Sequence, residues 1–185
     1  MVAGVAEGRG HLFDSPEEYQ PEERVVGGTE VDTPVTSRGQ TPETCLGYER
    51  GDHYTSPEPD AHDVARSYSL PKFLPSDHWA LKGKWKVEGQ RIVAQEANAS
   101  LQRNFSSGKV FLVLGTEGNQ PVKAIITLNG DPLRDAAGKD APGGSLTSSS
   151  IRSMKLIAQK SPTNGMLEMT ATAPRLKAYA CTFGS

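Results

Sequence analysis

Two cysteines, Cys45 and Cys181, carry the most reactive side chains of this chain. They form no C-x-x-C motif, so the dithiol exchange of thioredoxin-like proteins cannot be run by this chain alone. Two interpretations of the pair remain open. Either the thiols pack separately as small apolar groups, or they form a disulfide, which the chain-entropy model would credit with about 5 kcal/mol for so long a loop. A disulfide requires a Cα separation below about 7 Å.

The histidines offer little metal chemistry by their spacing. The four are scattered along the chain: His11, His53, His62 and His78. No pair has the H-x-x-x-H spacing or the Cys/His spacing of a metal site. His53 and His62 share a long polar connection with Asp52, Asp60 and Asp63, which predicts either a weak metal patch or a solvated loop. We expect the solvated loop.

Three aspartates in a glycine-containing loop, Asp131, Asp135 and Asp140, raise the question of a Ca²⁺ site. They lack the EF-hand spacing and its terminal glutamate, so Ca²⁺ is the weaker interpretation. The serine run at 148–150 is not a G-x-S-x-G elbow, and the glycines of this loop do not form a phosphate-binding motif. With no nucleophile–base pair or metal constellation in view, we expect a protein that is not an enzyme and needs no cofactor.

Aromatic residues are the remaining candidates for a binding site, because carbohydrate sites use exposed rings with polar groups beside them. Trp79, Trp85, Tyr48 and Tyr54 are the candidates for ligand contact. The alternative is that the two tryptophans, on neighbouring strands of a small sandwich, belong to the core. We expect the core placement to be the commoner outcome for such a pair.

These side chains must be positioned by strands. From His78 onward the chain consists of short segments rich in β-branched and aromatic residues, each closed by Gly, Asn or Ser. Turns are expected at Gly83, Asn129-Gly130, Asn164-Gly165 and Pro174-Arg175. The predicted strands are 44–48, 78–81, 84–88, 91–95, 99–105, 109–116, 122–128, 145–149, 151–158, 166–173 and 176–183. Many short strands without a βαβ pattern predict an all-β sandwich or barrel.

The first part of the chain reads differently. Residues 1–40 mix Gly, Pro, Glu, Ser and Thr with isolated hydrophobic residues, which predicts a flexible or extended tail before a domain at 41–185. Residues 51–75 form a long polar connection in which 63–68 could make a helical turn, while Tyr68, Leu70, Phe73 and Leu74 are expected to pin it to the sheet.

Charge and hydropathy exclude several classes of partner. The net charge of -2 gives no electrostatic footprint for nucleic acid. No apolar run approaches the roughly 18 residues of a membrane-spanning helix, so we do not expect the chain to be embedded in a membrane. Residues 1–10 lack the apolar core of a signal peptide, so none is expected in this chain.

Five motifs follow one another in the order typical of a known family. They are Thr41-Pro-Glu-Thr-Cys-Leu-Gly-Tyr-Glu-Arg, Asp77-His-Trp-Ala-Leu-Lys-Gly-Lys-Trp-Lys-Val, Val110-Phe-Leu-Val-Leu, Pro121-Val-Lys-Ala with Leu128-Asn-Gly-Asp-Pro, and Lys177-Ala-Tyr-Ala-Cys-Thr-Phe-Gly. Together they resemble the C-terminal domain of DipZ-like bacterial thiol–disulfide interchange proteins, a thioredoxin-family group. The resemblance spans residues 41–184, whereas the thioredoxin-like part of such proteins, with its C-x-x-C, is absent from this chain.

The resemblance implies a fold and a role. It implies an antiparallel jelly-roll β-sandwich, similar to galactose-binding-like carbohydrate-binding modules, in a periplasmic or cell-surface protein. The implied function is a non-catalytic accessory module that binds carbohydrate or cell-wall glycan. The alternative is a protein–protein interaction domain that positions a thioredoxin-like domain or another redox partner. Cys45 and Cys181 lie in the predicted first and last strands, which are close in many jelly rolls, so the resemblance keeps a disulfide open.

Overall fold

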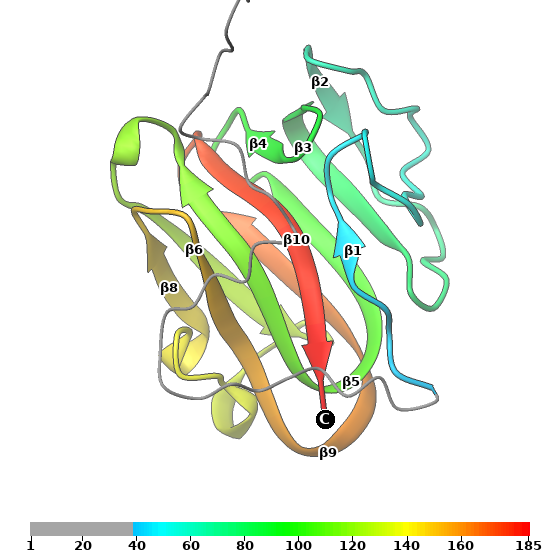
Figure 1. Ribbon diagram of the computed structural model, residues 1–185, viewed down its shortest axis with the longest axis vertical. Helices are drawn as coiled ribbons and strands as arrows, with labels where there is room; N and C mark the ends of the chain where they lie inside the picture. Colours follow the sequence, from blue (N-terminus) through cyan, green and yellow to red (C-terminus); the bar gives the residue numbers. More distant parts are fainter. Residues whose placement is uncertain (1–38) are drawn as a thin grey trace, which may run out of the picture.

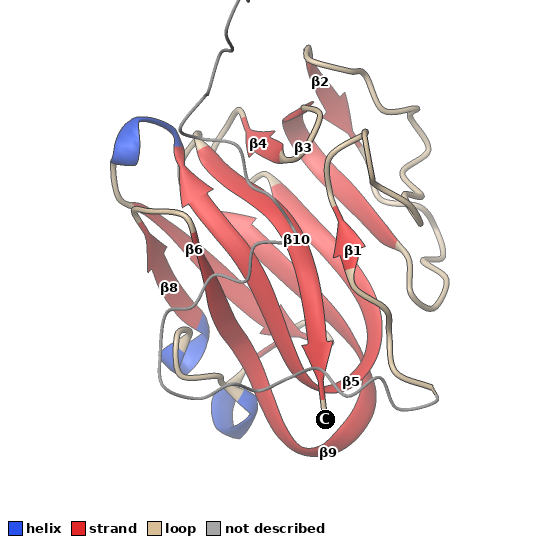
Figure 2. Cartoon of the chain, in the orientation of Figure 1, coloured by secondary structure: helices blue, strands red, loops and turns tan. Residues whose placement is uncertain are grey.

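A computed structural model describes residues 39–185 of the chain, so most of the predicted tail at 1–40 lies outside the described residues. Ten strands and three short 3₁₀ helices make up the described part (Figures 1 and 2). The 3₁₀ helices are η1 (Glu117–Asn119), η2 (Arg134–Ala136) and η3 (Pro142–Gly144). The strands are β1 (Thr44–Cys45), β2 (Ala65–Tyr68), β3 (Trp79–Val87), β4 (Ile92–Ala94), β5 (Ser100–Thr116), β6 (Val122–Leu128), β7 (Asp131–Pro132), β8 (Ser145–Ser148), β9 (Arg152–Ala171) and β10 (Leu176–Gly184).

Two long strands, β5 and β9, connect the two layers of the molecule. The first half of β5 pairs with the second half of β9, and the second half of β5 pairs with the first half of β9. Register shifts near Ser107 and Val110 interrupt this antiparallel pairing. The second half of β5 pairs with β10, which carries β1, whereas its first half pairs with β3. The second half of β9 pairs with β6, which carries β7 and β8. Figure 1 shows β5 and β9 curving from one layer into the other.

This arrangement confirms the predicted fold class, an antiparallel jelly-roll β-sandwich. The core lies between the layers and follows the period of two that strands impose. On β3 the inward positions are the odd ones, so Trp79, Leu81, Trp85 and Val87 are all buried. The outward positions of the same strand carry the lysines at 82, 84 and 86, which are exposed or half-buried.

Several predicted strand boundaries are wrong, because Gly83 and Asn164-Gly165 lie inside strands and do not form turns. Gly83 lies inside β3 with φ of 82°, opposite Tyr68, so the predicted strands at 78–81 and 84–88 are one strand. Asn164-Gly165 lies inside β9 and pairs with Ser106 and Phe105. In the same way the segments at 99–105 and 109–116 form β5, and those at 151–158 and 166–173 form β9.

The region before β3 also differs from expectation. The predicted helical turn at 63–68 is the strand β2, and the predicted strand at 44–48 is only the two residues of β1. Tyr68 and Leu74 are buried and do pin the connection, but Phe73 is 74% exposed and does not. The turn at Asn129-Gly130 is confirmed: it joins β6 to β7 with positive φ at both residues, the backbone of a type I′ turn.

Candidate functional site

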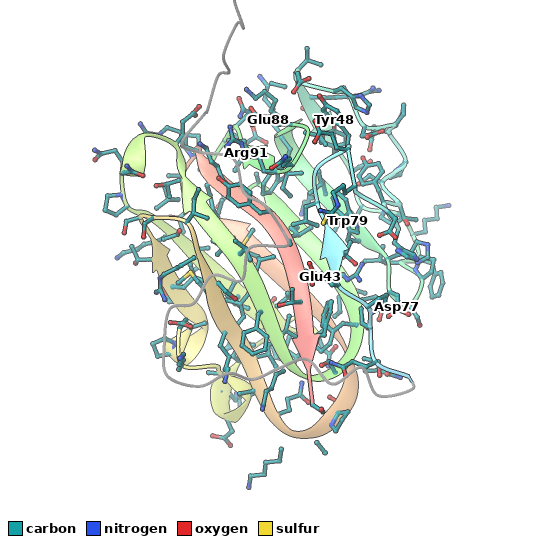
Figure 3. The ribbon with its side chains drawn as sticks, in the orientation of Figure 1. Glu43, Tyr48, Asp77, Trp79, Glu88 and Arg91 are labelled. Atoms are coloured by element: carbon teal, nitrogen blue, oxygen red, sulfur yellow. The ribbon has the colours of Figure 1, made fainter. Side chains whose placement is uncertain are left out.

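The strongest candidate site lies beside the turn that follows β1. We call it the Tyr48 surface, and it comprises Tyr48, His62, Asp63, Glu88 and Arg91. Figure 3 shows Tyr48, Glu88 and Arg91 close together at one end of the molecule, near β3 and β4. The residues come from three separate segments, so only the fold brings them together.

Backbone contacts hold this turn against the β3–β4 connection. The amide of Tyr48 donates to the carbonyl of Glu88 at 3.1 Å, and the amide of Glu49 donates to Gly89 at 2.9 Å. Gly47 permits this approach, because a Cβ at that position would lie only 2.3 Å from the carbonyl oxygen of Gly89. The position of the Tyr48 ring is therefore set by main-chain pairing and close packing.

The ring of Tyr48 is stacked on the imidazole of His62. The ring centroids are 3.9 Å apart and the planes differ by 11°. The Tyr48 hydroxyl donates to a carboxylate oxygen of Asp63 at 2.8 Å, and this hydrogen bond raises the pKa of the phenol. His62 Nε2 lies 3.2 Å from Asp60. His62 is 54% exposed although Tyr48 covers one of its faces, so the other face is open to solvent.

An ion-pair network borders the stack. Glu88 accepts from Lys86 Nζ and from Arg91 Nε, each at 2.5 Å. Burial pushes the pKa of the Glu88 carboxyl upward, but the hydrogen bonds from Lys86 and Arg91 outweigh it and lower the pKa. The Arg91 guanidinium also lies over the Tyr179 ring, 5.9 Å from its centroid. Charged donors and acceptors are thus held in fixed positions beside a flat aromatic face.

The two tryptophans predicted as ligand contacts are buried, and neither ring is open to a ligand. Trp79 is 2% exposed and Trp85 is fully buried, because both lie at inward positions of β3. Their indole N–H groups donate to backbone carbonyls, those of Asp52 at 2.7 Å and Lys82 at 3.0 Å. The core placement is therefore the correct one of the two alternatives.

Tyr54 is half-buried and lies among other aromatic rings. Its ring contacts those of Trp79 and Tyr68 edge to face, at centroid distances of 5.0 and 6.2 Å. Its hydroxyl donates to the carbonyl of Glu58 at 2.8 Å, and burial raises the pKa of the phenol. Of the four aromatic candidates, Tyr48 alone lies beside an open ring face.

Cys45 and Cys181 are free thiols, so of the two interpretations left open by the sequence, separate packing is the correct one. The strands β1 and β10 are neighbours as expected, but Cys45 pairs with Ala180 and Cys181 pairs with Thr44. Because side chains alternate across a strand, this one-residue offset sends the two thiols to opposite faces. Cys181 lies in the core, where burial raises its pKa to about 12. Cys45 is half-buried, and burial raises its pKa too.

Asp131, Asp135 and Asp140, for which Ca²⁺ was the weaker interpretation, do not converge. Asp140 accepts from Arg152 Nη1 at 3.1 Å and from the amide of Lys155 at 2.8 Å. Asp131 and Asp135 instead line a shallow hollow after the β6–β7 turn. Within residues 39–185 no group of three or more His, Cys, Asp or Glu side chains is placed to hold a metal ion.

One buried charged residue, Arg103, was not among the candidates predicted from the sequence. Arg103 is 1% exposed and donates to the carbonyl of Asp77 and the hydroxyl of Thr44, each at 2.6 Å. Its guanidinium lies over the Phe183 ring, 5.4 Å from the centroid. Arg103 thereby ties β1 and the loop before β3 to β5, the strand that carries it. The alternation of the sequence could have revealed its burial, because Arg103 occupies an inward position between Leu101 and Phe105.

None of the helices within the described residues is long and apolar enough to span a membrane. The comparison with curated proteins gave no match. Among solved structures, a family two carbohydrate esterase from Cellvibrio japonicus is similar at 9% identity and a TM-score of 0.46. The likeness covers 58% of this chain and 31% of the esterase chain, and it is too slight to bear on function. Residues 41–184 match the family model of the thioredoxin like C-terminal domain, and the chain therefore belongs to that family.

Proposed function

We propose that this chain is a non-catalytic accessory module of an extracytoplasmic thiol–disulfide exchange protein, and that it binds carbohydrate or cell-wall glycan. Membership of the thioredoxin like C-terminal domain family supports the accessory role, because this chain has no C-x-x-C of its own. The dithiol would be supplied by a thioredoxin-like domain or a separate redox protein.

The single observation that carries the glycan proposal is the open aromatic face of the Tyr48–His62 stack with polar groups at its edge. A sugar ring has an apolar C–H face and a rim of hydroxyls. The C–H face would pack on the open side of His62, while the hydroxyls would meet Asp63 and Asp60. Tyr48 supports the imidazole from behind, and its own hydrogen bond fixes the ring plane.

A glycan array, followed by calorimetric titration of any hit, tests this proposal. We expect His62→Ala to abolish binding, because it removes the contact face, and Tyr48→Ala to weaken it at least about 10-fold through loss of the support. Tyr54→Phe is the matched control, since it removes a tyrosine hydroxyl from the neighbouring aromatic cluster without touching the stack. Binding that survives both alanine variants would refute the site, and an empty array would refute glycan binding.

A second observation favours the protein–protein alternative. Phe73 is 74% exposed and Val64 is 57% exposed, both in the connection between β1 and β3. Exposed aromatic side chains are enriched at interfaces. If this alternative holds, a thioredoxin-like redox partner should bind the chain, and Phe73→Ser should weaken the complex measured by calorimetry. Unchanged affinity in Phe73→Ser would remove Phe73 from that role.

A further inference from the structure

Two histidines that are 25 positions apart in the chain meet beside the core tryptophan Trp79. The imidazoles of His53 and His78 have centroids 5.0 Å apart, with planes at 86°. Both residues are half-buried, and the side chain of His53 keeps 36% of its surface exposed. The pair shares no residue with the Tyr48 surface.

Trp79 holds the two histidines together. Its backbone amide donates to the carbonyl of His53 at 2.9 Å, and its indole N–H donates to the carbonyl of Asp52 at 2.7 Å. His78 directly precedes Trp79 and is itself tied by the bond from the Asn104 amide to its carbonyl, at 3.0 Å. The two imidazoles are therefore attached to one hydrogen-bonded frame.

The backbone at this frame is held in an uncommon conformation. His53 has φ of 59° and Asp77, the residue before His78, has φ of 63°. Left-handed backbone at residues other than glycine costs of order 1 kcal/mol and persists only where surrounding contacts maintain it. Here the bonds to Trp79 maintain it at His53, and the hydrogen bond from Thr41 to the Asp77 carboxylate, at 2.5 Å, restrains the second position.

Each imidazole has an acceptor beside Nδ1. Nδ1 of His78 lies 2.8 Å from the carbonyl oxygen of Ser76, an acceptor that requires a proton on this nitrogen. Nδ1 of His53 is buried and lies 2.9 Å from a carboxylate oxygen of Asp52, although not in line for a full hydrogen bond. The proton on Nδ1 of His78 leaves its Nε2 with a free lone pair, and a proton on Nδ1 of His53, facing Asp52, would do the same there.

His78 makes the contact that metal-binding histidines make, and Asp52 lies beside Nδ1 of His53 in the corresponding place. Such histidines donate Nδ1–H to a carboxylate or a backbone carbonyl, which selects the tautomer and orients the ring. A zinc–nitrogen bond of about 2.0–2.1 Å puts the metal about 3.2 Å from each ring centroid, and a near-tetrahedral angle then separates two centroids by about 5 Å. The observed separation of 5.0 Å matches that value.

We propose that His53 and His78 together bind a divalent transition-metal ion, Zn²⁺ or Cu²⁺, through their Nε2 atoms. Imidazole nitrogen is the ligand type that these two ions favour. Since the described residues add no third ligand of the His, Cys, Asp or Glu type, the other coordination positions are left to water or to an exchangeable ligand. Asp52 and the carbonyl of Ser76 orient the rings without touching the metal.

The test is calorimetric titration of the full chain, without a polyhistidine tag, with ZnCl₂ and separately with CuCl₂. We expect one ion per chain. His53→Asn and His78→Asn are the informative variants, because asparagine keeps a donor in place of Nδ1 and removes Nε2. Asparagine also tolerates the left-handed backbone at position 53. Each should weaken binding at least 10-fold, and Asp52→Ala should weaken it about 10-fold through loss of ring orientation.

Two further variants distinguish this pair from the other histidines. His11→Asn should leave the affinity unchanged, and so should His62→Asn, whose Nε2 already lies beside Asp60. A nitrogen-15 spectrum of the imidazoles should show metal-induced shifts at Nε2 of His53 and His78, with Nδ1 still protonated. That spectrum does not depend on how well the variants fold.

The proposal would be overturned if neither Zn²⁺ nor Cu²⁺ bound. It would also be overturned if His53→Asn or His78→Asn kept the full affinity, or if His62→Asn or His11→Asn lost it. Glycan binding is measured in the presence of a chelator, so the metal site and the Tyr48 surface can fail independently.

Discussion

Alkylation of the folded protein with iodoacetamide at about pH 8 should modify Cys45 and spare Cys181. Cys181 is 1% exposed in the core, and burial raises the pKa of its thiol to about 12. Since only the thiolate reacts, the reactive fraction at pH 8 is about 10⁻⁴, roughly 1,000-fold below that of an unperturbed thiol. The need for the fold to open before reagent can enter lowers the rate further.

Peptide mapping by mass spectrometry after timed quenching measures both rates in one sample. The same labelling in denaturant is the internal control, because both thiols should then react at similar rates. Two free thiols without prior reduction are also expected, since the β1–β10 register sends the side chains to opposite faces. Equal native rates would refute the buried position of Cys181, and a disulfide in the unreduced chain would refute the register.

The raised pKa of Cys181 also makes stability depend on pH. Below pH 9 the thiol is neutral in both states and has no effect on the free energy of unfolding. As pH rises from 9 toward 12 the unfolded chain ionises and the folded chain does not, so stability falls by about 1.4 kcal/mol per unit. Between pH 8 and pH 10, the free energy of unfolding measured in urea should therefore fall by about 1.4 kcal/mol more in the unaltered protein than in Cys181→Ala. An equal loss in both proteins would contradict the burial argument.

Three more changes test the frame of the fold and its charges. Trp79→Phe should lower the free energy of unfolding by about 1–3 kcal/mol in urea titrations, because the Asp52 carbonyl loses its indole donor; an unchanged midpoint would refute this. Gly47→Ala should lower the free energy of unfolding by more than about 2 kcal/mol, since its Cβ would lie 2.3 Å from a carbonyl oxygen. Gly108→Ala is the control that should be tolerated, because a Cβ there would lie 3.6 Å from its nearest neighbour. Glu88→Gln should be less stable than the unaltered protein at neutral pH, because the contacts that lower the Glu88 pKa stabilise only the ionised carboxylate. The difference in free energy of unfolding between the two proteins should therefore narrow as pH falls below about 4.5. A difference that does not change with pH would contradict this reasoning.

Local patterns were enough to predict the class of fold. Alternation at 122–128 identified β6, and Asn129-Gly130 identified the turn after it, because both signals depend only on neighbouring residues. The same local reasoning failed at Gly83 and Asn164-Gly165, which continue long strands. There the pairing partners on other strands outweigh the turn preference of the residues themselves.

The candidate sites could not be predicted in the same way. His53 meets His78, and Tyr48 stacks on His62, only because separate loops are pinned to β3 and to the β3–β4 connection. The sequence alone determined that the chain forms an antiparallel sandwich and that it lacks a C-x-x-C motif. The tertiary structure decided which aromatic ring stays open and that the two thiols point to opposite faces. Those outcomes depend on strand register, in which a shift of one residue reverses the face of every side chain.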